Sequence, residues 1–294
     1  MTPVSPASQR RWISSLPRNW CFGAIPPLGH FTRSSTHWCR TPRTPRCCAG
    51  AASRIQQSGS FKTTLSRSVA YDYLLFLPPA YGANTERRWP TILFLHSTAE
   101  SGANLALLLK NGPPKLLETI TAENSKLQTP SEAAKAIASE FIVLSPQCPA
   151  GQGWDADALL ALLDDVSAKH RVDSSRVYLT GFSMGGFGTW SLGLRHPHRF
   201  AAIAPICGGG DFIELGAGLP AKRPALQSLP IWAFHGRNDT QVPLSESERM
   251  IDAVKKVSGN NGVRLTVYPD AGHDAWTETY DNPELYRWFL QHRR

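Results

Sequence analysis

The first quarter of this 294-residue chain lacks acidic residues altogether. No Asp or Glu precedes Asp72, whereas residues 1–71 carry ten Arg and Lys side chains. Removing these ten from the 31 basic residues leaves 21 against 23 acidic ones, so the net charge of +8 is the sum of +10 in this segment and −2 in the rest of the chain. A basic, serine-rich start without an uninterrupted apolar core is typical of an organelle transit peptide rather than of a secretory signal.

We therefore predict two regions. Residues 1–60 form a disordered basic leader that directs the protein to a chloroplast or mitochondrion, and residues 61–294 form one folded domain. Three other interpretations of the leader stay open: a disordered tail of a cytoplasmic protein, a nucleic-acid-binding arm, and a misplaced start codon.

Cysteines and long apolar runs are scarce after the leader. Only Cys148 and Cys207 lie there, and two cysteines do not make a disulfide framework. Cys207 precedes three glycines, but it has no partner histidine of its own, so a buried small hydrophobic side chain is favoured over a second nucleophile. No stretch of about eighteen apolar residues is present, so we expect no membrane-spanning helix.

Short apolar strands alternate with longer helical stretches along the rest of the chain. We predict strands at residues 71–77, 91–96, 141–145, 177–180, 201–206, 231–235 and 263–268. This alternation predicts an α/β fold with a mostly parallel central sheet and helices on both faces, which binds ligands at the carboxyl ends of its strands.

Ser183 stands in a G-x-S-x-G pattern, between the strand at residues 177–180 and a helix-compatible stretch at residues 187–195. This pattern marks a sharp strand-to-helix turn that lifts the serine oxygen above the sheet. The alternative is a glycine-rich turn in which the serine is only a spacer, and that interpretation requires no partners downstream.

Partners of the required kinds follow two later strands. A serine hydroxyl is a poor nucleophile near neutral pH and needs a base, and the base needs an acid to hold its tautomer. Asp239 follows the strand at 231–235, and His273 follows the strand at 263–268. We predict Ser183 as nucleophile, His273 as base and Asp239 as acid.

Other titratable residues near these positions receive no catalytic role. Asp270 and Asp274 flank His273 and are interpreted as surface turn residues, with Asp239 favoured as the acid by its place in the chain order. His96 and His235 end strands, and we expect hydrogen-bonded structural imidazoles there, without metal-ligand spacing.

An oxyanion hole needs one backbone amide after the nucleophile and a second from another loop. We predict the amides of Met184 and Thr98, because the loop at residues 97–102 follows the strand at 91–96. The same loop is also compatible with an ordinary strand-to-helix connection capped by Ser97 or Ser101.

Residues from about 71 to the C-terminus resemble the phospholipase/carboxylesterase and dienelactone-hydrolase-like family of α/β-hydrolases, in its branch of esterases and proposed peptidases. The resemblance rests on residues 93–96, 144–149 with Trp154, 178–190, 204–210, 234–243 and 268–276. It implies a serine hydrolase of small carboxylic esters, related to feruloyl esterases and polyhydroxybutyrate depolymerases, that needs no metal or organic cofactor and no nucleic acid.

One departure from the family pattern concerns the predicted oxyanion loop. The family has glycines after the histidine, where this chain has Ser97 and Ala99. If the turn requires φ > 0, each of these adds strain of about 1 kcal/mol; otherwise the loop takes another path. A peptidase or thioesterase with the same triad, and a catalytically weak binding protein on this fold, remain alternatives.

Two longer connections are candidates for the rim of the pocket, where substrate choice is decided; for residues 102–140, a surface excursion with one amphipathic helix is an equally good interpretation. Residues 102–140 include a helix-prone stretch at 131–137. Residues 211–229 are rich in Gly, Pro and Ala and are predicted to form an irregular loop. The oligomeric state is left open by the sequence.

Overall fold

The computed structural model describes residues 60–64, 66, 68–83, 85–120, 129–216 and 219–294. The chain divides into two units, residues 1–63 and residues 64–294. In the first unit the described residues 60–63 form neither helix nor strand. Apart from Ser60, the predicted leader lies outside the described residues, so its disorder and its targeting role stay predictions.

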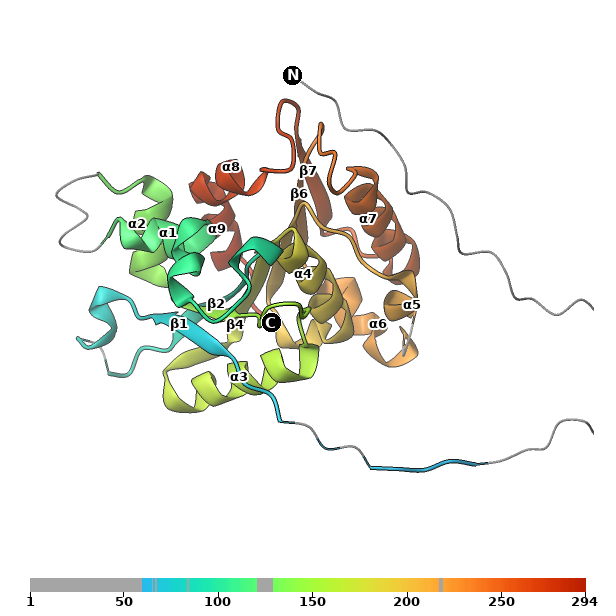
Figure 1. Ribbon diagram of the computed structural model, residues 1–294, viewed down its shortest axis with the longest axis horizontal. Helices are drawn as coiled ribbons and strands as arrows, with labels where there is room; N and C mark the ends of the chain where they lie inside the picture. Colours follow the sequence, from blue (N-terminus) through green and yellow to red (C-terminus); the bar gives the residue numbers. More distant parts are fainter. Residues whose placement is uncertain (1–59, 65, 67, 84, 121–128, 217–218) are drawn as a thin grey trace, which may run out of the picture. The chain divides into compact units, whose positions relative to one another are not determined.

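A seven-stranded sheet forms the centre of the second unit, in the order β1-β3-β2-β4-β5-β6-β7 (Figure 1). Strand β1 is antiparallel to β3, and all other neighbouring strands are parallel. Every predicted strand is present, and the α/β class is confirmed. The bounds are β1 Asp72–Phe76, β2 Trp89–Leu95, β3 Ile142–Gln147, β4 Val172–Phe182, β5 Ala202–Ile206, β6 Ile231–Gly236 and β7 Val263–Tyr268.

Helices cover both faces of this sheet and bury two separate apolar clusters. Strand β2 is buried at every residue, and its side chains alternate: Leu93 and Leu95 enter one cluster, Ile92 and Phe94 the other. The first cluster is closed by α3 Ala156–Lys169, α4 Met184–Arg195, α5 Phe212–Gly216, α6 Leu219–Ser228 and α7 Ser245–Ser258. The second is closed by α1 Gly112–Glu118, α2 Glu132–Glu140, α8 Trp276–Asp281 and α9 Pro283–Leu290.

Short 3-10 helices occupy several connections: η1 Pro79–Tyr81, η2 Thr98–Glu100, η3 Leu105–Lys110 and η5 Pro197–Arg199. The predicted helix at residues 131–137 is α2, whose first turn is capped by Ser131 through a hydrogen bond from the Ala134 amide. Within the described part of the chain, no helix combines the length and apolar character needed to cross a membrane.

The prediction of an irregular loop at residues 211–229 is wrong. Helices α5 and α6 lie there, and Leu215 and Leu226 are buried against the first cluster. Pro220 stands in the first turn of α6, where a helix needs no amide hydrogen, whereas Pro224 lies inside the helix and removes one backbone hydrogen bond. Packing of these leucines overrides the low helix propensity of the proline and glycine residues.

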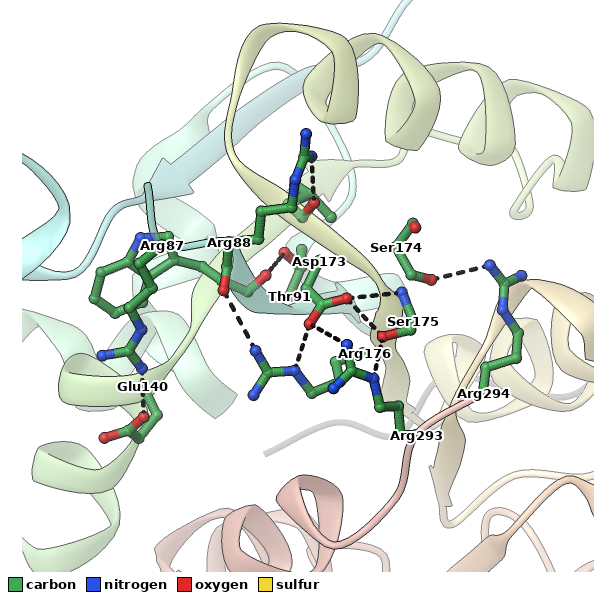
Figure 2. A network of polar contacts seen from close by, with 12 residues as sticks. Arg87, Arg88, Thr91, Glu140, Asp173, Ser174, Ser175, Arg176, Arg293 and Arg294 are labelled. Carbon is green, nitrogen blue, oxygen red and sulfur yellow. Dashed lines mark hydrogen bonds and ion pairs between the residues drawn. The ribbon is translucent and has the colours of Figure 1, made fainter. Parts of the chain in front are cut away.

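The amino end of β4 is held by a network of arginines around Asp173 (Figure 2). The register between β2 and β4 shifts there, between Trp89↔Val172 and Thr91↔Val177. Asp173 accepts hydrogen bonds from the amide and hydroxyl of Ser175 and from Nε of Arg176. Arg294 donates its amide to the Ser175 carbonyl oxygen, which fastens the end of the chain to the bulged part of β4.

Candidate active site

Ser183 forms a strained turn between β4 and α4. Its φ of 54° and ψ of −119° lie in a region that residues with a β-carbon rarely adopt. The turn is fixed by its backbone, since the Ser183 amide donates to the Ile206 carbonyl oxygen at 3.0 Å. A β-carbon at Gly185 would lie 1.9 Å from the Leu95 carbonyl oxygen, so only glycine lets α4 start this close to β2.

The three residues predicted as nucleophile, base and acid lie in one hydrogen-bonded chain. Nε2 of His273 is 2.9 Å from Oγ of Ser183, and Nδ1 of His273 is 2.7 Å from Oδ2 of Asp239. The carboxylate can only accept, so Nδ1 carries the proton and Nε2 is free to accept from the serine hydroxyl. The three residues follow the carboxyl ends of the parallel strands β4, β6 and β7. Strands β6 and β7 are neighbours, and β5 lies between β4 and β6.

Asp239 is fixed by bonds that leave one oxygen for the histidine. Its side chain is fully buried, and Oδ1 accepts the amides of Gln241 and Val242 at 2.9 Å each. Such a carboxylate cannot turn away from His273 without losing both amide bonds. The arrangement can therefore hold an imidazole in one tautomer and stabilise its protonated form.

The two competing aspartates lie elsewhere. The two carboxylate oxygens of Asp274 accept hydrogen bonds from the amide and the hydroxyl of Thr277, in the first turn of α8, at 3.0 Å each. Asp270 is exposed on the loop after β7.

His96 is a buried structural imidazole, as predicted. Its Nε2 accepts from the Cys148 amide at 2.9 Å, so Nδ1 carries the proton and donates to the Ser97 carbonyl oxygen at 2.5 Å. Burial lowers the pKa of His96, which keeps this ring neutral.

His235 is also buried, but it has a contact that sequence reasoning missed. Its Nε2 lies 2.9 Å from the Val242 carbonyl oxygen and 3.3 Å from Oδ2 of Asp239. Its Nδ1 lies 2.8 Å from Oγ of Ser247. The spacing of four residues between His235 and Asp239, across the end of a strand, was the signal available in the sequence.

The predicted oxyanion loop is a capped 3-10 turn. Ser97 has an extended conformation, with φ of −85°, and Oγ of Ser97 accepts from the Ala99 amide. Glu100 accepts from the Ser97 amide at 3.1 Å, which completes a capping box. Neither Ser97 nor Ala99 has a positive φ, so the strain considered for them is absent and the loop takes another path.

The two predicted oxyanion donors, Thr98 and Met184, are the first residues of η2 and α4. First-turn amides have no partner within their own helix. Among the described residues neither amide has an acceptor. The start of α4 touches the end of β2, because a β-carbon at Gly185 would meet the carbonyl oxygens of Leu95 and His96. Both donors therefore stand at the edge of the sheet where the half-buried Ser183 lies.

Cys207 lies beside the strained turn at Ser183, which we call the elbow, and is buried with φ of 39°. Burial raises the pKa of its thiol, which disfavours the reactive thiolate. Within the described part of the chain, no group of three His, Cys, Asp or Glu residues is arranged to hold a metal ion.

Comparisons with known proteins agree with this geometry. A family model described as Esterase PHB depolymerase matches residues 71–218, half of the chain, and one described as Phospholipase/Carboxylesterase matches residues 155–282. Poly(3-hydroxyalkanoate) depolymerase C of Paucimonas lemoignei is 44% identical over 167 residues, covering 44% of this chain and 39% of that protein. Feruloyl esterase B of Thermothelomyces thermophilus is 32% identical over 148 residues, covering 40% and 48%.

Among solved structures, a thermostable esterase is similar with a TM-score of 0.59 and 26% identity, over 76% of this chain and 59% of that one. The chain spans less than half the length of the two curated relatives named above. The α/β-hydrolase fold and the resemblance to the phospholipase/carboxylesterase family are confirmed. With a model that matches half of its residues, the chain belongs to the esterase PHB depolymerase family.

Proposed function

We propose that this protein is a serine hydrolase that cleaves small carboxylic esters through an acyl-enzyme on Ser183. The observation that carries the proposal is the hydrogen-bonded chain from Ser183 through His273 to Asp239 at the carboxyl edge of the sheet. Membership of an esterase family and the esterase names of its relatives support the same reaction class.

In the first half of the reaction, Oγ of Ser183 forms a bond to the ester carbonyl carbon while Nε2 of His273 takes the hydroxyl proton. The carbonyl oxygen becomes an oxyanion that the amides of Thr98 and Met184 stabilise. The carbon–oxygen bond to the alcohol then breaks, and His273 returns its proton to the leaving oxygen.

In the second half, water replaces the alcohol. The water oxygen attacks the acyl carbon while His273 takes a proton from it. The bond from the acyl carbon to Oγ of Ser183 then breaks, His273 gives its proton back to that oxygen, and the acid is released. Asp239 holds the imidazole in the required tautomer and stabilises it when it is protonated. Peptides and thioesters would follow the same steps, so substrate assays decide among them.

The test compares the full-length wild type with Ser183→Ala on p-nitrophenyl esters of increasing acyl length, with a thioester and a peptide p-nitroanilide alongside. We expect turnover of the esters by wild type and a loss of about 10⁴-fold or more in the variant, at an unchanged circular dichroism spectrum. Equal turnover by the variant would contradict the serine mechanism. If folded wild type cleaves only the thioester or only the anilide, its substrates are thioesters or peptides rather than esters.

A further inference from the structure

The buried carboxylate of Glu100 links the Thr98 loop to a distant part of the chain. Glu100 is only 2% exposed. Its Oε2 accepts from the amide and the hydroxyl of Ser97, at 3.1 and 2.7 Å, and its Oε1 accepts from Nδ2 of Asn111 at 2.7 Å. A carboxylate this deeply buried is costly unless donors surround it, so these bonds hold the loop firmly.

Asn111 continues this connection toward the base. It lies between η3 and α1, and its Oδ1 accepts from Nε1 of Trp276 at 3.3 Å. The ring of Trp276 meets the His273 imidazole edge to face, with ring centroids 5.4 Å apart. A continuous set of contacts therefore runs from the predicted oxyanion loop to the ring of the predicted base.

The direction of these hydrogen bonds is unique. A carboxylate only accepts and an indole N–H only donates. The amide of Asn111 must therefore turn Nδ2 toward Glu100 and Oδ1 toward Trp276. No other orientation of Asn111 satisfies both neighbours.

The loop bonds also set the direction of the Thr98 amide. A trans peptide points its C=O and N–H in opposite directions. His96 holds the Ser97 carbonyl oxygen on one side, so the Thr98 N–H is held toward the other. Glu100 fixes the remaining polar atoms of Ser97, which leaves the Thr98 amide as the donor without an acceptor among the described residues.

We propose that Glu100, Asn111 and Trp276 are positioning residues that hold the Thr98 amide and the His273 ring in a fixed relation. Donor and base then act on the same tetrahedral intermediate without first being brought together. The proposal rests on the proposed function, because it assigns these residues to the same reaction.

Glu100→Gln tests the direction of the bridge. The substitution replaces one accepting oxygen by an NH₂ donor. If the remaining oxygen still accepts from Ser97, the new NH₂ group faces the Nδ2 donor of Asn111. The Asn111 amide must then turn over, which brings its Nδ2 donor against the Nε1 donor of Trp276. Trp276→Phe removes that indole donor but keeps an aromatic ring against His273, so in the double variant the turned Asn111 meets no opposing donor.

Wild type, the two single variants and the double variant are compared by kcat and KM for p-nitrophenyl butyrate. The same proteins are compared by Ki for an aryl trifluoromethyl ketone, which forms a tetrahedral oxyanion adduct on serine. We expect Glu100→Gln to lower kcat by about 10- to 100-fold and to weaken the ketone by a similar factor, with KM within about twofold. The loss caused by Glu100→Gln is smaller when Trp276→Phe is already present.

Asn104→Ala is the matched control. Asn104 caps η3 through the Ala106 amide and its side chain does not contact Glu100, so its loss lowers the unfolding temperature and leaves kcat and Ki unchanged. If Glu100→Gln does not fold, Asn111→Ala removes both bridge bonds without adding a donor and gives the same loss of kcat.

If wild type is active and neither kcat nor Ki changes in Glu100→Gln or Asn111→Ala, the positioning role is wrong and the proposed function stands. The same holds if the effects of Glu100→Gln and Trp276→Phe simply multiply in the double variant. A folded wild type without turnover or ketone binding would overturn both.

Discussion

Two buried carboxylates stand at opposite ends of the central sheet, and they are held in different ways. At the carboxyl end, Glu100 is surrounded by neutral donors from Ser97 and Asn111. At the amino end, Asp173 is paired with Arg176, with Arg293 at 3.5 Å (Figure 2). Under our proposal the first carboxylate positions an amide that binds the substrate oxyanion, whereas the second joins parts of the fold.

The remaining donors make the difference clear. At the amino end, arginine side chains donate to backbone carbonyl oxygens, as Arg88 does to Val172 and Arg294 does to Ser174. At the carboxyl end, the Thr98 and Met184 amides have no acceptor among the described residues. Polar groups left without partners at a structured edge are what a reacting oxyanion needs, so the two ends should respond differently to substitution.

The largest effect is expected where α4 meets β2. Gly185→Ala places a β-carbon against the Leu95 carbonyl oxygen, so the elbow must move. We expect a loss of about 3 kcal/mol or more in the free energy of unfolding, together with a fall of about 100-fold or more in kcat for the folded protein. Urea unfolding and ester kinetics on the same sample measure both quantities.

Gly82→Ala is the control for a glycine without such a neighbour. Gly82 has a right-handed helical conformation, and a β-carbon there would meet nothing within 4 Å. Its unfolding free energy should change by less than about 0.5 kcal/mol. Similar losses in both variants would show that the contact at Gly185 is not what fixes the elbow.

A smaller effect is expected at the amino end. Asp173→Asn weakens the bonds from Ser175 and Arg176, and we expect a loss of about 1 to 3 kcal/mol in unfolding free energy with kcat unchanged. Although burial raises the pKa of Asp173, the bonds from Ser175 and Arg176 lower it below the ordinary value. The carboxylate therefore stabilises the protein fully above about pH 4, and this contribution is lost as pH falls through the lower folded-state pKa.

Urea unfolding of wild type and Asp173→Asn at pH 7 and pH 3 checks this prediction, because the difference should shrink at the lower pH. If wild type and Asp173→Asn differ equally in unfolding free energy at pH 7 and pH 3, the charge of Asp173 is not what stabilises the amino end. If kcat falls in the variant, the amino end also affects catalysis.

The sequence predicted the parts of the molecule that local patterns encode. Strand β2 is an apolar run because both of its faces are buried, and β7 was predicted with its observed bounds. The glycines around Ser183 indicated the elbow because close backbone approach requires them. The chain order of Asp239 and His273 brought the right residue types to neighbouring strand ends.

Other features depend on contacts that no local pattern contains. Ser97 and Glu100 have the spacing of a capping box and could have been recognised, whereas the bond between Asn111 and Trp276 joins residues 165 positions apart. Helices α5 and α6 were missed because packing of buried leucines outweighs their proline and glycine content. The resemblance implies a loop with glycines where this chain has Ser97 and Ala99. Here a capped turn connects β2 to η2 with ordinary backbone angles instead.

We infer that Ser183 is the activated nucleophile at the carboxyl end of the sheet. Diethyl p-nitrophenyl phosphate tests this role without a substrate assay, because attack by a serine oxygen forms a phosphate ester and releases p-nitrophenolate. We expect about one equivalent of p-nitrophenolate per chain, a diethylphosphoryl group on Ser183 by peptide mass spectrometry, and neither in Ser183→Ala. If folded wild type released no p-nitrophenolate, or if the label lay on Cys207 or another residue, Ser183 would not be the nucleophile.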